Sequence, residues 1–262
     1  MTDKTPLDTA HAAMEHACDD SSARLRFFER LADSELFLLL QSEAVGETIS
    51  PEVFEVDGRK YALIFDREER LAEFVDGSAH HAAMSGRVVA AMLAGKGIGL
   101  GLNLGVAPSS ILLPAEALVW LVNMLDRAPE EVTEQPVSIA SPKDIPKALL
   151  AALDVKLATA GGLAKSAYLV TVVYENKRQS NLVAVIDAVP AAQKALAKAV
   201  SEVIGFSAIE DGELDVAFFS TDDPICRKLE KVGLRFDLPK RKKPVHEPVA
   251  PGRDPENPPI LR

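Results

Sequence analysis

The segment from Asn103 to Pro114 is the part of this chain whose residue types and position best suit a binding site. This segment joins a glycine-rich apolar run to a predicted helix, and it contains the adjacent serines Ser109 and Ser110. Asn103 lies at the carboxyl end of the predicted strand, where ligands of α/β proteins often bind next to a helix N-terminus. The segment therefore predicts a pocket for a small molecule or a peptide, lined by Asn103, Ser109 and Ser110. The competing interpretation is that these residues only form and stabilise a turn, and the sequence favours this second interpretation.

Two glycine-rich stretches resemble phosphate-binding loops in composition but not in pattern. Residues 95–101 (GKGIGLG) place a glycine after the lysine, and residues 161–166 (GGLAKS) place an alanine before it. A P-loop requires Gly-Lys-Ser/Thr at the opening of a helix. The spacing of Gly99, Gly101 and Gly105 also misses the dinucleotide fingerprint. We expect these glycines to allow close packing against a strand instead.

No metal or cofactor site is expected. His11, His16 and Cys18 are separated by five and two positions, so they cannot share one face of a helix. His80 and His81 are adjacent, and adjacent residues of a strand point to opposite faces.

A catalytic centre is not supported by the remaining reactive groups. Cys226 lies in the first turn of a predicted helix, but Asp222 and Asp223 oppose a lowered thiol pKa, and a small buried residue is the favoured interpretation. The pair Glu68 and Glu69 also lies at a helix start, where acidic residues are expected. No G-x-S-x-G motif is present. Triads need not be contiguous, so an inconspicuous hydrolase-like enzyme near residues 103–114 remains the alternative function.

Composition restricts the partners and the compartment. The chain has 262 residues, 47% of them hydrophobic, and a formal net charge of −10. Residues 1–130 contain 11 basic and 21 acidic residues, whereas residues 131–262 contain 18 of each. Such a balance argues against DNA as a partner. No secretory signal or membrane-spanning apolar run is evident, so we expect a cytoplasmic protein with two thiols.

Apolar periodicity predicts five regions along the chain. They are an N-terminal extension (1–20), a first domain (21–130), a linker (131–136), a second domain (137–238) and a disordered Pro- and Lys-rich tail (239–262). The tail opens with four basic residues, 240–243, which read as a solvated segment or as a contact for an acidic partner.

The first domain is predicted as a mixed α/β sandwich. Asp57-Gly58 separates two strands and indicates a hairpin. Asp66 with Glu69 forms a predicted capping box at the start of a helix. Ser21 or Ser22 is the expected cap of the domain's first helix, while a short Ala-rich helix at 7–17 is expected to be loosely attached.

The second domain is predicted from an alternation of strands and helices. Strands are expected near 137–140, 167–174, 182–189 and 214–219, with helices between the first two and the last two. This order, βαββαβ, is typical of a smaller ferredoxin-like domain. A further helix is expected to end at Gly233.

Particular segments of the chain resemble the SseB (enhanced serine sensitivity) family. They include Phe65 to Phe74, residues 99–116 with Trp120-Leu121 beyond, and the block from Ser141-Pro142 to Leu153. Leu104 departs from the family pattern, in which a proline often follows the asparagine. The resemblance implies a two-domain α/β protein linked by name to a serine-sensitivity trait, and it supplies no catalytic residue.

The expected function is therefore non-catalytic binding. The partner is a protein or a small ligand sensed for regulation, a homo-oligomer is left open, and neither DNA nor a membrane is expected.

Overall fold

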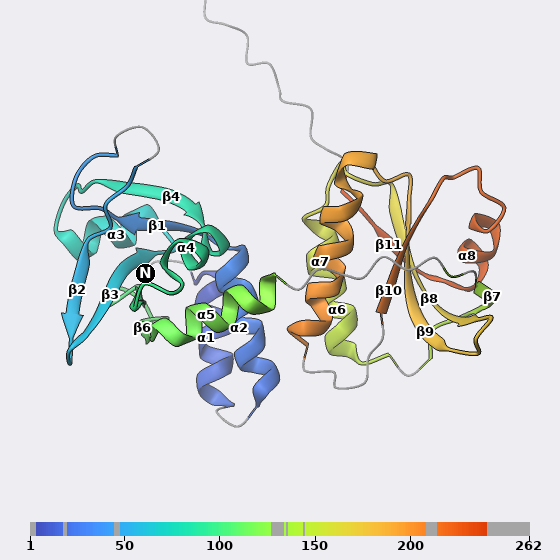
Figure 1. The fold of residues 1–262 in the computed structure, drawn as a ribbon, viewed down its shortest axis with the longest axis horizontal. Coiled ribbons are helices and arrows are strands. Elements are labelled where there is room, and N and C mark those ends of the chain that lie inside the picture. Colours follow the sequence, from blue (N-terminus) through green and yellow to red (C-terminus); the bar gives the residue numbers. More distant parts are fainter. Residues whose placement is uncertain are drawn as a thin grey trace, which may run out of the picture.

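The protein is described here from a computed structural model. The structure describes residues 4–17, 20–44, 48–126, 134, 136–143, 145–207 and 214–239. Cys18, most of the predicted linker and the predicted tail beyond Pro239 lie outside the described residues. The described chain forms two α/β domains (Figure 1), which confirms the predicted fold class.

The described residues of the first domain form five helices and six strands. They are α1 (Pro6–His16), α2 (Ser21–Asp33), β1 (Glu35–Leu39), β2 (Val53–Val56), β3 (Arg59–Phe65), α3 (Glu68–Val75), β4 (His81–Ser85), α4 (Gly86–Leu93), β5 (Ile98–Leu102), β6 (Ile111–Leu113) and α5 (Ala115–Leu125). The strands form one mixed sheet of order β4-β1-β3-β5-β6, and β2 pairs with β3 beside β1. Only β3 and β5 run parallel to each other.

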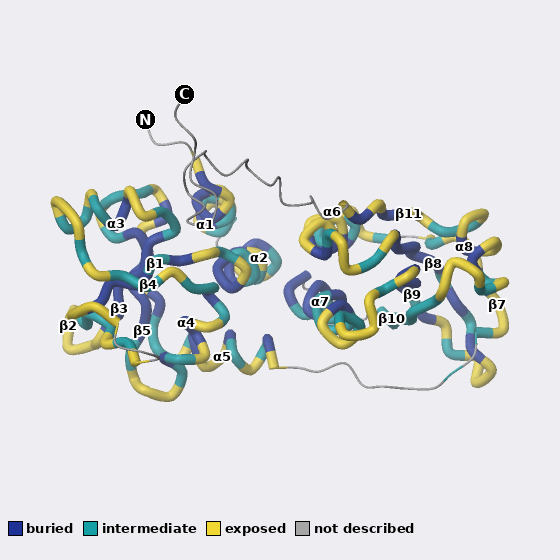
Figure 2. The backbone as a smooth tube through the Cα atoms, turned by 90° about the horizontal axis from the view of Figure 1, so that it is seen from above, coloured by how far each residue is buried: buried dark blue, intermediate teal, exposed yellow. Residues whose placement is uncertain are grey.

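The two faces of this sheet are covered unequally. Alternate residues of a strand point to opposite faces. Leu36, Leu38 and Ile64 point to the face that α1, α2, α4 and α5 cover, whereas Leu63 and Phe65 point to the face under α3. The second view shows the buried strands enclosed between these helices (Figure 2).

Helix α1 is part of the first domain's core, contrary to the expected loose attachment. Leu7 is 1% exposed and belongs to the hydrophobic core of the first domain, which also includes side chains of α2, α4 and α5. Thr5 and Asp8 form a capping box at the start of α1. The Ala-rich composition suggested a weak helix, but burial of Leu7 and Asp8 attaches it to the domain.

The turn predictions were right at the hairpin and wrong at two caps. Asp57 and Gly58 adopt positive φ angles of 51° and 74°, as a type I′ turn requires. Helix α2 is capped by Asp20 instead of a serine. Asp66 does not cap α3, because its carboxylate turns into a buried polar network instead.

In the second domain, the part of the chain that the structure describes forms three α-helices, a short 3₁₀ turn and five strands. They are β7 (Pro136–Ala140), α6 (Lys147–Ala158), β8 (Ser166–Tyr174), β9 (Gln179–Ile186), η1 (Pro190–Ala192), α7 (Gln193–Gly205), β10 (Leu214–Phe219), α8 (Cys226–Val232) and β11 (Leu234–Asp237). The order of the predicted elements is confirmed, although the linker is shorter than expected because β7 begins at Pro136.

The ferredoxin-like assignment of the second domain is wrong. In a split βαβ unit, the parallel strands joined by a helix are separated by another strand. Here β9 and β10, which α7 joins, pair directly and in parallel, while β7 and β8, which α6 joins, are antiparallel. The additional strand β11 pairs with β8 along the same edge as β7. Element order is a local property, and it did not specify which strands would pair.

The two domains meet through helices α2, α4 and α5 of the first and α6 and α7 of the second. Phe206, directly after α7, is 1% exposed and packs in the core of the first domain. Beside it lies an interdomain ion-pair cluster made of Glu29, Asp33, Arg87, Lys156 and Glu202.

Candidate functional site

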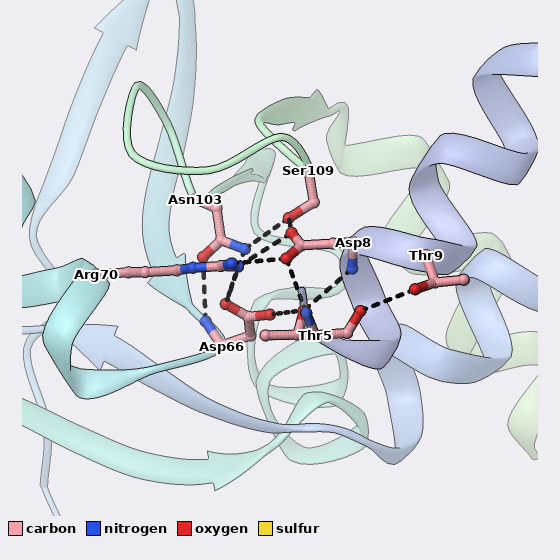
Figure 3. Close-up of polar contacts among 7 residues, drawn as sticks. All are labelled: Thr5, Asp8, Thr9, Asp66, Arg70, Asn103 and Ser109. Atoms are coloured by element: carbon pink, nitrogen blue, oxygen red, sulfur yellow. Dashed lines mark hydrogen bonds and ion pairs between the residues drawn. The ribbon is translucent and has the colours of Figure 1, made fainter. Parts of the chain in front are cut away.

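A buried polar network lies where the sequence predicted a pocket, and it includes two of the residues expected to line that pocket (Figure 3). Arg70 donates to both carboxylate oxygens of Asp8, at 2.6 and 3.0 Å, and to Asp66 at 2.8 Å. Asn103 donates its amide Nδ2 to Asp66 at 3.0 Å and to the Ser109 hydroxyl at 2.9 Å. Ser109 in turn donates to Asp8 at 2.6 Å. Two carboxylates thus surround one guanidinium.

Four elements bring these side chains together. Asp66 follows β3 and Asn103 follows β5, and because these two strands are parallel their carboxyl ends lie at the same edge of the sheet. The backbone N–H of Asp66 donates to the Asn103 side-chain oxygen at 3.1 Å. Arg70 is one helical turn beyond Asp66 on α3. Asp8 comes from α1, more than sixty residues away in sequence.

Further hydrogen bonds fix the positions of Asn103 and Thr5. Asn103 adopts a left-handed backbone with φ of 49°, a conformation that asparagine tolerates better than most residues. Its N–H donates to the carbonyl of Ile64 at 2.9 Å. Thr5 donates its hydroxyl to Asp66 at 2.6 Å, so the start of α1 is attached to both sides of the network.

Electrostatics favour the charged forms within this network. Burial by itself would raise the pKa of Asp8, but hydrogen bonds from Arg70 and Ser109 outweigh it and hold that pKa well below its usual range. The two carboxylates conversely raise the pKa of Arg70 against the effect of burial. The Nε atom of Arg70 has no hydrogen-bond partner among the described residues.

The structure brings together two of the three predicted site residues. Asn103 and Ser109 are fully buried, with 0% exposure, and both bond to network partners. A ligand would have to displace Asp8 or Asp66 to reach them. Ser110 lies outside the network, is exposed, and accepts a hydrogen bond from the N–H of Gly105 at 3.3 Å.

Sequence reasoning missed Asp8, Asp66 and Arg70 as members of this cluster. The four-residue spacing of Asp66 and Arg70, across the start of the predicted helix, was a usable signal. Nothing local indicated that Asp8 would contact them, because that contact depends on how α1 docks.

The other predicted candidates have structural roles. A Cβ on Gly99 would lie 2.8 Å from the Tyr61 ring, and one on Gly101 would lie 2.7 Å from Leu63. These glycines therefore let side chains lie flat on the sheet, as expected. Cys226 is buried, and burial together with Asp223 raises the pKa of its thiol.

The described part of the chain presents neither a metal-binding cluster nor a membrane-spanning helix. No group of three or more His, Cys, Asp or Glu side chains there is placed to hold a metal ion. Within the same residues, no helix has the length and apolar character needed to cross a bilayer.

The fold is that of a two-domain α/β protein. Its buried polar network holds helices and strands of the first domain together. Comparison with protein families then identifies the class. The SseB protein N-terminal domain matches residues 7–120, and the SseB protein C-terminal domain matches residues 132–232. The two matches span most of the chain, so the protein belongs to the SseB family, as the resemblance predicted. No curated protein and no solved structure matches the chain.

Proposed function

We propose that this protein is a non-catalytic binding module, and that it binds a protein partner through the outer sides of α4 and α5. The observation that carries this proposal is the exposure of three large apolar side chains on two helices that pack against each other. Val88 on α4 is 52% exposed, and Val119 and Trp120 on α5 are 39% and 37% exposed.

Trp120 has the properties of an interface anchor. It is the only tryptophan of the chain, and its ring packs edge-on against Phe28 of α2 with the ring centroids 5.0 Å apart. That contact fixes the ring while a third of it stays exposed. Tryptophan is enriched among residues that dominate binding energy at protein interfaces, and a ring already held in place loses little freedom on binding.

The buried network supports a binding role over the hydrolase-like alternative. Ser109 donates to a carboxylate whose pKa is lowered, and among the described residues no imidazole bonds to it. A weakly basic carboxylate is a poor general base at neutral pH. The serine and asparagine nearest to the predicted reaction site therefore act as internal contacts of the first domain.

The test compares three variants of the full-length protein in capture from its own cells. Val88→Lys and Val119→Lys place a charge on the proposed surface and leave Trp120 intact. Val155→Lys is the matched control, because Val155 is also on a helix, is 46% exposed, and belongs to the second domain. Each change is on the surface and should alter the free energy of unfolding by less than about 0.5 kcal/mol.

A supporting result is a partner retained by the wild type and Val155→Lys but lost by Val119→Lys. With that partner purified, Trp120 emission should shift to shorter wavelength on mixing, because binding removes water from the ring. The affinity should fall about thirtyfold in Val119→Lys. A partner held equally by all variants would contradict the proposed surface, and a hydrolytic activity lost in Ser109→Ala would favour the enzyme.

A further inference from the structure

The interdomain ion-pair cluster contains more acidic than basic side chains. The carboxylates of Glu29, Asp33 and Glu202 are arranged around two cations, the ammonium of Lys156 and the guanidinium of Arg87. The side chain of Lys156 is 6% exposed, so water does little to screen its charge. With all five groups ionised, three negative charges therefore face two positive ones at a largely buried place.

Glu29 is the least compensated of the three carboxylates. It lies 3.5 Å from the Lys156 ammonium. Asp33 and Glu202 lie closer to that ammonium, at 2.7 and 3.1 Å, and both also bond to Arg87. Burial has the largest effect on Glu29, and it raises the pKa of this carboxyl above the ordinary value because it disfavours the charged form.

The remaining titratable groups around Glu29 are weaker partners or bond elsewhere. On α2 itself, the charge of Asp33 repels Glu29 more strongly than Arg30 attracts it. Helix α1 also packs against α2, and its buried titratable groups are Asp8 and His11. Asp8 bonds within the network of Figure 3, and the His11 ring packs against an aromatic ring of α2. The ion pair across the domain boundary to α6 is therefore the main favourable contact of a charged Glu29.

We propose that Glu29 takes up a proton when the two domains dock, which makes the domain interface a pH-sensitive switch that loosens as the pH rises. A neutral carboxyl next to Lys156 removes the excess negative charge of the cluster and lowers the cost of burying it. Loosening releases Phe206, which is 1% exposed in the docked molecule and packs in the core of the first domain. The switch uses other residues than the protein-binding surface on α4 and α5.

The direction of the pH effect follows from the direction of the pKa change. A carboxyl whose pKa is raised in the docked state binds its proton more tightly there than after the domains separate. Its contribution to docking is therefore fully present below the ordinary value of 4.5 and is lost as the pH rises through the raised value. Asp33 and Glu202, whose pKa values are lowered, act in the opposite sense and at lower pH.

The rate at which Lys156 is acetylated measures the opening of the interface. An amine-reactive reagent reaches this side chain when the domains separate, because it is 6% exposed in the docked molecule. Lys165, whose side chain is 60% exposed, is the internal reference. The intrinsic dependence of amine reactivity on pH then cancels in the ratio of the two rates. Digestion and mass spectrometry of the labelled full-length protein give both rates.

The variant Glu29→Gln mimics the protonated carboxyl and should keep the interface closed at high pH. At a pH of about 8.5, the ratio of Lys156 to Lys165 labelling should be about tenfold higher in the wild type than in Glu29→Gln, and this difference should shrink as the pH falls toward about 5. Glu73→Gln, at an exposed position of α3, is the matched control and should behave as the wild type does. As a second measurement, the thermal unfolding midpoint of Glu29→Gln should exceed that of the wild type at high pH and approach it at low pH.

The proposal is overturned if Lys156 is labelled no faster in the wild type than in Glu29→Gln at high pH. It is also overturned if the difference between the two proteins stays constant with pH, or if Glu73→Gln changes the labelling ratio as much as Glu29→Gln does. None of these results bears on partner capture through Val119, so the two proposals can fail separately.

Discussion

Arg70 is the charged side chain around which the first domain's buried polar groups are arranged. Its side chain is 2% exposed, and it bonds to two carboxylates whose own side chains are 0% and 4% exposed. A buried ion pair of this kind contributes little net stability, because desolvation of the charges offsets their attraction. Removing one partner is costly, however, because the other charge then remains buried with less compensation.

We predict that Asp8→Ala lowers the free energy of unfolding by about 3 kcal/mol. The change leaves Arg70 with Asp66 alone and deprives Ser109 of its acceptor. Urea denaturation followed by circular dichroism measures the effect. Ser110→Ala, an exposed neighbour outside the network, should change stability by less than about 0.5 kcal/mol.

Asp8 should also contribute to the acid sensitivity of the protein. Its pKa is lowered in the folded state, so its stabilising effect is fully present above the ordinary value near 3.9 and is lost as the pH falls below it. The stability difference between wild type and Asp8→Asn should therefore shrink as the pH is lowered from about 5 to about 2. A constant difference over that range would show that the Asp8 charge is not the stabilising feature.

At the scale of elements, β5 shows why a strand can require glycine. A Cβ at Gly99 would lie 2.3 Å from the carbonyl oxygen of Leu113 as well as close to the Tyr61 ring. The atoms nearest to a Cβ at Gly101 would all be side-chain atoms, of Leu63 and Leu104. Side-chain ends can rotate away, whereas a backbone oxygen held in the β5–β6 pairing cannot.

We therefore predict that Gly99→Ala destabilises the protein by about 2 kcal/mol and that Gly101→Ala costs clearly less. Thermal and urea unfolding of the two variants, compared side by side, give the order. Ala83→Val, at an exposed position of β4, is a control for adding volume to a strand. Equal losses at Gly99 and Gly101 would contradict the backbone explanation.

At the scale of the whole molecule, the interdomain ion-pair cluster makes the two domains one unit. The Lys156 ammonium lies 2.7 Å from Asp33 and 3.5 Å from Glu29 of the first domain, and 3.1 Å from Glu202 of its own. Arg87 belongs to the first domain, and its guanidinium lies 2.7 Å from Glu202 of the second domain. Burial would raise the pKa of Glu202, but its hydrogen bonds with Arg87 and the charge of Lys156 keep that pKa low.

We predict that Lys156→Met lowers the unfolding free energy by about 3 kcal/mol and separates the unfolding of the two domains. The reason is that Asp33 and Glu202 would share the single charge of Arg87, and Glu29 would lose its ion pair with Lys156. Calorimetry should show two transitions where the wild type shows one. The comparison variant Lys165→Met removes a 60% exposed lysine from an ion pair with Asp187 and should have little effect. A single, unshifted transition in Lys156→Met would mean that Phe206 alone joins the domains.

Much of the local structure could be predicted from the sequence, because it depends on neighbours along the chain. The Asp57-Gly58 turn is set by the backbone preferences of its own two residues. The sequence also showed, through residues matching the SseB family, that the chain forms two α/β domains.

Only the tertiary structure decided which distant groups meet. Asp66 had the spacing of a helix cap, yet it bonds to Arg70, Thr5 and Asn103, because capping and burial compete for the same carboxylate and the docked α1 favours burial. The pairing of β7 and β11 with one edge of β8 likewise depends on contacts across many residues. Periodicity states which face of an element is apolar, but the partner of that face is a property of the folded chain.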